Sequence, residues 1–193
     1  MKAHSSFQLN EKYDKNNMNK FDKEIWTDTY FDNAEYTIVS GYHNKYNNAT
    51  LRRTIYYHKK LNVVIIRDIG KSSEKRKWIN RFNLNEKVNY SLSDDNQAVL
   101  KFDEDYIIIS NLTNQYVKCI DSLTNEFVEK PFYSNKVNQK INNSQLIYED
   151  EYKEETEHIF CITFNEKNII HIKKERNYLV LSKSGIEVRL PIV

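Results

Sequence analysis

Apolar and polar residues alternate over most of this chain, which is the pattern of β-strands with one buried face. The clearest run covers residues 50–58 and is rich in β-branched and aromatic side chains. A polar corner at residues 59–62 separates it from a second apolar run that ends at Gly70, and this pair predicts a β-hairpin. After a polar turn, residues 77–84 alternate again. The three predicted strands form an antiparallel meander.

Similar but shorter runs occur elsewhere and are separated by turn-forming clusters of Asp, Asn and Ser. They predict strands at residues 2–10, 24–31, 34–42, 88–92, 98–102, 106–110, 116–120, 156–164, 169–173, 178–181 and 186–190. Residues 11–23 and 125–143 lack the pattern and are expected to be irregular. No segment keeps a 3.6-residue apolar period over three turns, so little helix is expected. The fold class that follows is all-β, an antiparallel β-sandwich forming a single domain over residues 1–193.

The first predicted strand begins almost at Met1. Natural domains seldom open on a committed strand, so we expect the sequence to continue upstream as part of a longer protein. Residues 1–30 contain no apolar run typical of a signal peptide, and no segment of the chain is long and apolar enough to span a membrane.

Composition excludes some partners and leaves others open. The 193 residues carry a formal net charge of +2, and basic and acidic residues are interleaved, so nucleic acid is not expected as a partner. The 14 tyrosines could form a sugar-stacking surface, although half-buried strand tyrosines are the simpler interpretation. Cys119 and Cys161 match no zinc or redox spacing and are expected to be buried thiols, with a disulfide as the alternative if their strands face one another.

Among the five histidines, no pair has the spacing of a metal site. Isolated strand histidines are more often surface or half-buried residues than ligands. We therefore expect His58, His158 and His171 to be surface or half-buried residues and not ligands.

Four short motifs resemble a known family. A Gly-Tyr-His-x-x-Tyr segment from Gly41 leads into paired arginines, then an apolar strand ends in Arg-Asp, and a later strand ends Phe-Asn-Leu at Leu84. Near the start, residues 3–7 read AHSSF. This order resembles the C-terminal β-domain of the heparinase II/III-like polysaccharide lyases, in which strands read roughly AHNTV, R-x-I/V, V-I-x-D and F-H-L. Asn83 stands where that family often has histidine.

The resemblance implies a bacterial lyase that cleaves uronate-containing polysaccharide by β-elimination. In the family, most catalytic groups belong to an N-terminal (α/α) toroid and one to an upstream β-strand, so this chain alone is expected to be inactive, with no catalytic residue of its own. Its partners would be acidic polysaccharide and the missing toroid. A full-length lyase of this kind would act in the cell envelope or outside the cell.

The family also holds a metal, usually zinc, in its β-domain. One of the ligands is the histidine of the AHNT strand, which corresponds to His4 here. The resemblance therefore implies that His4 is the last of three ligands to a structural zinc, whose other ligands would lie upstream. The alternative is that His4 is a solvent residue near the chain terminus.

The substrate-binding candidates are Tyr42, His43, Arg52 and Arg53. A guanidinium can bind a uronate carboxylate or a sulfate through two parallel hydrogen bonds. Neighbouring strand residues point to opposite faces, so only one arginine can face a groove directly. The structural alternative is an arginine paired with Asp68 on the adjacent strand.

Two further functions remain open from the sequence. One is a stand-alone carbohydrate-binding β-sandwich with no enzyme attached. The other is a capsule or exopolysaccharide assembly protein that keeps the fold without catalysis.

Overall fold

The computed structural model describes residues 6–9, 25–46, 48–93, 97–113, 116–121, 132–133, 141–142, 144–165, 170–183 and 185–193. The described residues form strands and turns without helix, which confirms the predicted all-β class. In these residues no helix is available to cross a membrane. The strands are β1 (Ser6–Leu9), β2 (Ile25–Asp32), β3 (Tyr36–Tyr46), β4 (Ala49–His58), β5 (Val63–Asn83), β6 (Asn89–Leu92), β7 (Gln97–Phe102), β8 (Asp105–Asn111), β9 (Tyr116–Asp121), β10 (Phe132–Tyr133), β11 (Ile141–Asn142), β12 (Ser144–Phe164), β13 (His171–Lys174), β14 (Tyr178–Lys183) and β15 (Ile186–Pro191).

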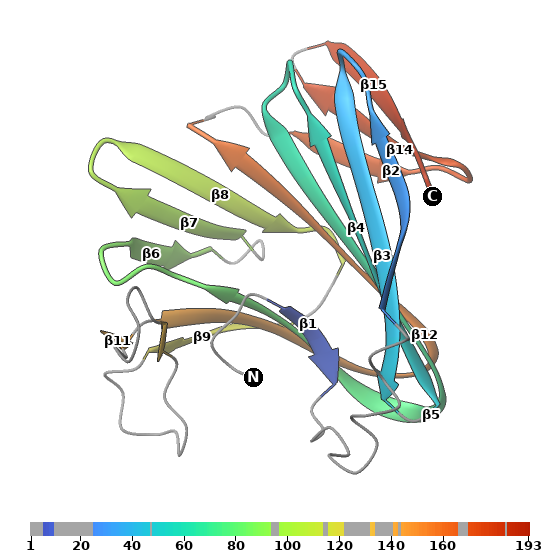
Figure 1. Cartoon of the computed structure of the whole chain (residues 1–193). Coiled ribbons are helices and arrows are strands. Elements are labelled where there is room, and N and C mark those ends of the chain that lie inside the picture. The colour runs from blue at the N-terminus through green and yellow to red at the C-terminus, as the bar shows by residue number, and fades with distance from the viewer. Residues whose placement is uncertain are drawn as a thin grey trace.

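The main sheet is antiparallel and has the strand order β2-β3-β4-β5-β12-β8-β7-β6, with β1 paired to β5 and β9 paired to β12. A separate sheet contains β13, β14 and β15 (Figure 1). The predicted hairpin of β4 and β5 is present, and His58 at its corner accepts a hydrogen bond at Nδ1 from the backbone N–H of Leu61 at 3.1 Å.

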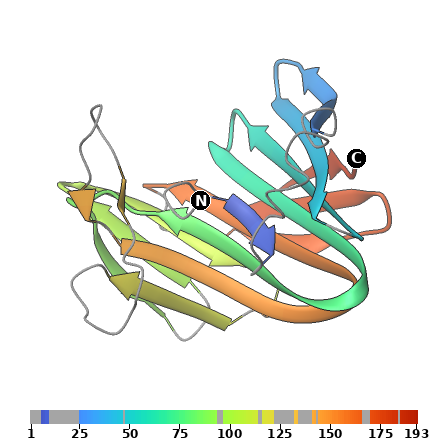
Figure 2. The same cartoon turned by 60° about the horizontal axis from the view of Figure 1, so that its bottom comes forward.

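The two longest strands, β5 and β12, have 21 residues each and bend together along their shared ladder (Figures 1 and 2). The predicted turn after Gly70 is therefore wrong, and β5 continues through it as one strand. Its polar residues are explained by ion pairs across the ladder, such as Lys71 with Glu155 at 2.8 Å and Lys77 with Glu149 at 3.1 Å. On β12 the first half, from Ser144, was not predicted as a strand.

A β-bulge accompanies the bend. The register between β5 and β12 shifts between Tyr152 and Glu154, and Glu154 has a positive φ of 73°. Between the pairs Tyr152/Arg76 and Glu154/Ser72, β12 has one residue and β5 has three, so the extra residues lie on β5. Extra residues on one strand of a pair increase its local bending. The bend divides both strands into an upper limb, containing the N-terminal half of β5, and a lower limb, containing its C-terminal half.

The two limbs pack face to face, so that β5 folds onto itself. Trp78 of the lower limb covers Gly70 of the upper limb, because a Cβ built on Gly70 would lie only 2.3 Å from the indole ring. Further from the bend, the rings of Phe82 and Tyr148 meet Phe160 edge-to-face at 5.1 and 4.8 Å. These aromatic contacts belong to the core between the limbs.

The outer face of the upper limb is covered by the three-stranded sheet of β13, β14 and β15. Buried residues of both sheets form this second core, including Tyr56, Ile65 and Leu181. Cys161 belongs to the same core as a buried free thiol, and burial raises its pKa to about 12. The buried-thiol prediction is confirmed for Cys161, whereas the side chain of Cys119 lies outside the described residues.

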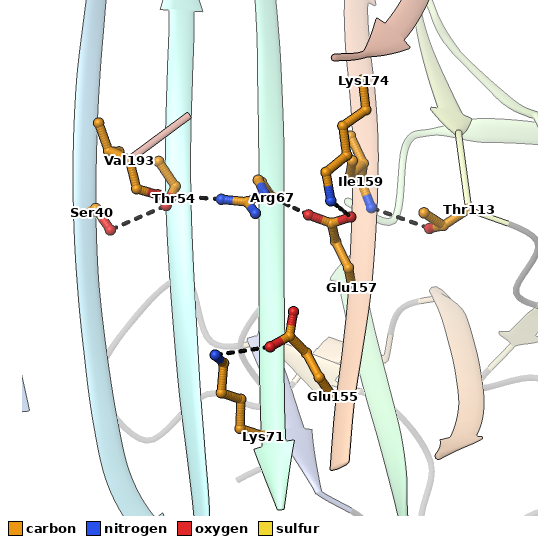
Figure 3. Close-up of polar contacts among 10 residues, drawn as sticks. All are labelled: Ser40, Thr54, Arg67, Lys71, Thr113, Glu155, Glu157, Ile159, Lys174 and Val193. Carbon is orange, nitrogen blue, oxygen red and sulfur yellow. Dashed lines mark hydrogen bonds and ion pairs between the residues drawn. The ribbon is translucent and has the colours of Figure 1, made fainter. Parts of the chain in front are cut away.

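A partly buried ion-pair cluster lies beside this second core (Figure 3). Arg67 on β5 donates through Nε to Glu157 on β12 at 2.7 Å and through Nη1 to the carbonyl oxygen of Val193 at 3.2 Å. Lys174 on β13 binds the other oxygen of Glu157 at 2.5 Å. Burial raises the pKa of Glu157, but the hydrogen bonds from Lys174 and Arg67 outweigh burial and leave this pKa below its ordinary value.

Gly70→Ala tests the packing of the bend. The added methyl group collides with the Trp78 indole, which is almost completely buried, so we expect a loss of about 1–3 kcal/mol in the free energy of unfolding. Trp78→Phe removes the outer indole ring that the methyl group would meet. Urea unfolding of the double-mutant cycle should show a smaller cost of Gly70→Ala in the Trp78→Phe background. An equal cost in both backgrounds would argue against this contact.

Glu157→Gln tests the ion-pair cluster. The folded-state pKa of Glu157 is lowered, so its stabilising contribution is complete above the ordinary pKa of 4.5 and disappears as the pH falls through the folded-state value. We expect the variant to be about 2 kcal/mol less stable than the parent at pH 7 and the difference to shrink at pH 3. Glu155→Gln, which breaks only an exposed pair, is the control and should stay within about 0.5 kcal/mol of the parent. Equal losses for the two variants would contradict the assignment.

Candidate functional site

One row of residues crosses five strands of the upper limb on the face that turns toward the lower limb. Neighbouring strands place these residues directly opposite one another: Thr27 on β2, Gly41 on β3, Arg53 on β4, Asp68 on β5 and His158 on β12. The row begins at the exposed edge strand and ends in the interior, where His158 is completely buried. The sheet register therefore leads from solvent to a buried histidine.

Arg53 and Asp68 form the charged centre of this row. The arginine binds the carboxylate with two parallel hydrogen bonds, from Nε and Nη2, each of 2.7 Å. The Asp68 side chain is completely buried, whereas that of Arg53 is 28% exposed. Burial lowers the pKa of Arg53, but the Asp68 charge and hydrogen bonds outweigh burial and raise this pKa above the ordinary value. The structural alternative, an arginine paired with Asp68 on the adjacent strand, is thus confirmed for Arg53.

A groove of about 350 Å³ opens beside Arg53. It is lined by Phe7, Trp26, Thr27, Val39, Ser40, Gly41, Tyr42, His43, Leu51, Arg52, Arg53 and Ile55. Gly41 lies opposite Arg53 and contributes no side chain to the groove. A Cβ on Gly41 would lie 2.7 Å from the carbonyl oxygen of Trp26, so the approach of β2 to β3 requires glycine here.

Trp26, Tyr42 and Arg52 form the adjacent row of the same strands. The Trp26 and Tyr42 rings stack with centroids 4.8 Å apart, and the Arg52 guanidinium lies 5.9 Å from the centre of the Tyr42 ring. Arg52 also forms an ion pair with Asp28 on the edge strand. Trp26, Tyr42 and Arg52 thus contribute two aromatic rings and one guanidinium from one face of these strands, and Arg53 contributes a second guanidinium from the other face. Each guanidinium is held by a carboxylate.

Behind Arg53, hydrogen bonds continue into the interior. Arg53 Nη2 donates to Asn80 Oδ1 at 2.9 Å, and Asn80 Nδ2 lies 2.6 Å from His158 Nδ1. His158 Nε2 lies 2.8 Å from Asp150 Oδ2, which also accepts a hydrogen bond from Thr156 at 2.7 Å. Asn80 and Asp150 belong to the lower limb, so this chain crosses the space between the limbs.

The structure brings together all four predicted substrate-binding residues, because Tyr42, His43, Arg52 and Arg53 line the same groove. Whether they bind a substrate stays a prediction. Arg52 and Arg53 point to opposite faces of β4, as the sequence indicated, and both are paired.

The predicted zinc ligand His4 lies outside the described residues. Within the described part of the chain, no group of three His, Cys, Asp or Glu side chains could hold a metal ion. These residues alone do not fit a zinc site, and no step of the function proposed below uses one.

Two histidine predictions are wrong. His158 is completely buried by Phe7, whose ring lies 5.4 Å away, and by the folded-over lower limb. His58 is 4% exposed, and burial lowers its pKa. His171 is exposed, as expected.

Sequence reasoning also missed the roles of Asn80 and His158. A signal was present, because Asn80 interrupts an alternating face otherwise formed by Trp78, Phe82 and Leu84. His158 likewise shares its face with Phe160. A polar residue on an apolar strand face indicates a buried hydrogen-bonded group. It does not identify the partner across the fold.

Comparisons with known proteins agree with this fold. The heparan sulfate lyase HepC from Pedobacter heparinus superimposes with a TM-score of 0.76 at 13% identity, covering 99% of this chain and 30% of the lyase. A heparinase III structure gives a TM-score of 0.72 at 16% identity, covering 97% of this chain and 29% of that enzyme. This chain thus spans less than a third of the length of these enzymes. No curated protein sequence matches it.

The sequence itself matches the family described as heparinase II/III-like, C-terminal, over residues 1–159. This match covers most of the chain, including the groove and the bend. The chain belongs to the heparinase II/III-like C-terminal domain family.

Proposed function

We propose that this chain is the C-terminal part of a polysaccharide lyase that cleaves uronate-containing polysaccharide by β-elimination. The single observation that carries the proposal is the groove, whose lining residues include the aromatic residues Trp26 and Tyr42 and the arginines Arg52 and Arg53. The role assigned to this chain is to bind and orient the acidic polysaccharide. Cleavage requires groups supplied by an upstream helical domain.

The chemistry of the groove supports an acidic sugar. An aromatic face packs against the C–H face of a pyranose ring, and Trp26 is 39% exposed at the edge of the groove. Arg53 uses Nε and Nη2 for Asp68 and Asn80, whereas Nη1 has no hydrogen bond to the described residues. Its two N–H donors can bind a carboxylate or sulfate oxygen.

Charge alone does not explain binding here. Asp68 and Asp28 neutralise the two arginines at close range, so the groove offers directed hydrogen bonds rather than a strong positive field. Such a site selects among acidic ligands by the direction of its hydrogen bonds. We therefore propose that it holds a uronate in one orientation, as β-elimination requires for removal of the proton α to the carboxylate.

The groove also supports a second candidate function. All of its lining residues are within this chain, so a stand-alone carbohydrate-binding protein would use the same surface. In that case no upstream catalytic domain is needed. The two functions share the binding prediction below and differ in whether a lyase domain is encoded upstream.

Substitutions in the groove test glycan binding. We expect Trp26→Ala and Arg52→Gln each to weaken binding of heparan sulfate or polygalacturonate about 5- to 10-fold, because each removes a stacking or cation–π contact. Arg189→Gln on β15 is the control, since this exposed arginine lies on the other sheet. Isothermal titration calorimetry gives the affinities. Equal affinities for all variants and the parent would contradict a glycan site in the groove.

Incubation with polysaccharide tests whether this chain binds the substrate without cleaving it. The unmodified chain should release no unsaturated uronate from heparan sulfate or polygalacturonate, because the proposal assigns the catalytic groups to an upstream domain. Ultraviolet absorbance follows the unsaturated product. A heparinase III enzyme serves as the positive control. Any turnover by this chain would disprove the assignment of catalysis to an upstream domain.

A further inference from the structure

The hydrogen-bond chain behind Arg53 has a fixed direction, and this direction assigns the proton on His158. Arginine can only donate, so Asn80 must present its Oδ1 to Arg53. The Asn80 amide nitrogen then faces His158 and donates to it at 2.6 Å. Nδ1 of His158 must therefore accept, and the ring proton lies on Nε2, where it donates to the Asp150 carboxylate at 2.8 Å.

We propose that His158, held as the neutral ring with its proton on Nε2, is a positioning residue that orients Arg53 in the groove through Asn80. This proposal rests on the proposed function, because it gives Arg53 a role in glycan binding. His158 itself has no contact with the groove. It acts by presenting an acceptor at Nδ1, which fixes the orientation of the Asn80 amide.

The geometry shows why Arg53 needs this support. Asp68 alone holds Nε and one N–H of Nη2, and the Asn80 hydrogen bond adds a contact from the opposite limb. If Nδ1 of His158 carried a proton, the Asn80 amide would have to reverse and turn its N–H groups toward Arg53. Two donors would then face each other, and the hydrogen bond to Arg53 would be lost.

The groups around His158 hold its ring in this orientation. Asp68 lies directly opposite His158 in the ladder, Phe7 of β1 packs on its ring, and Asp150 and Thr156 close the far side. Asp150 also lines a cavity of about 430 Å³ together with Tyr152, Glu155 and Glu157. The hydrogen-bond chain thus runs from one cavity of the protein to another.

Nitrogen-15 NMR of histidine side chains tests the proton assignment without any ligand. At neutral pH the His158 ring should show the Nε2–H tautomer. A ring protonated on Nδ1 would overturn the proposal. Because no glycan is present, this result is independent of the proposed function.

A matched pair of variants tests the effect on Arg53. In His158→Asn the amide oxygen can occupy the position of Nδ1 and accept from Asn80, whereas in His158→Gln the amide nitrogen occupies the position of Nε2 and serves only Asp150. Both variants lose the ring contact with Phe7. We expect His158→Asn to keep heparan sulfate affinity within about 2-fold of the parent and His158→Gln to lose about 5-fold, which corresponds to about 1 kcal/mol.

The Arg53 side-chain signals provide a second readout on the same samples. In the parent and in His158→Asn, rotation of the Arg53 guanidinium should be slow by NMR, and in His158→Gln it should be faster. Identical behaviour of the two variants would overturn the positioning role. If the parent binds no heparan sulfate but the NMR differences appear, the proposed function fails and the positioning of Arg53 stands.

Discussion

The fold of β5 onto itself is the constraint on which the rest of this structure depends. Gly70 and Trp78 are only eight positions apart on one strand, yet the indole covers the glycine across the bend. The paired strand β12 bends with it, and the extra residues of β5 at the register shift opposite Glu154 accompany the change of direction. Because both strands bend together, the ladder between them continues and the sheet gains an inner face between its two limbs.

This inner face combines an apolar core with a polar row. Away from the bend, aromatic rings such as Phe82 and Phe160 fill the space between the limbs. Close to the bend, Arg53, Asp68 and His158 take that place, and Asn80 completes their hydrogen bonds from the other limb. Buried charges of this kind are tolerated only when they are paired and hydrogen-bonded. The same bend that builds the core therefore brings together the groups that hold Arg53 in the groove.

Local pattern was sufficient to predict much of this from sequence. Period-two alternation located most strands, and the arginine pair on opposite faces of β4 followed from strand geometry alone. The bend was not predictable in this way. The polar residues from Lys71 to Lys77 looked like a turn, but Lys71 and Lys77 pair with Glu155 and Glu149 of β12, which lie 84 and 72 residues later in the chain. Long-range pairing of this kind leaves no local signal.

The candidate site likewise combines residues that local sequence indicates with residues that only the fold brings together. A local motif and the chemistry of guanidinium groups identify Tyr42, His43, Arg52 and Arg53. Asn80 and His158, in contrast, come close to Arg53 only through the bend. The family match fixes the fold and leaves the ligand open, since the solved relatives share at most 16% identity in the comparisons reported above.

The most direct test of this account is a crystal structure of the chain with a bound uronate oligosaccharide. The account predicts a sugar carboxylate at Nη1 of Arg53 in the groove, with Asn80 and Asp68 still bound to the same guanidinium. An oligosaccharide bound elsewhere, such as on the sheet of β13 to β15, would contradict it.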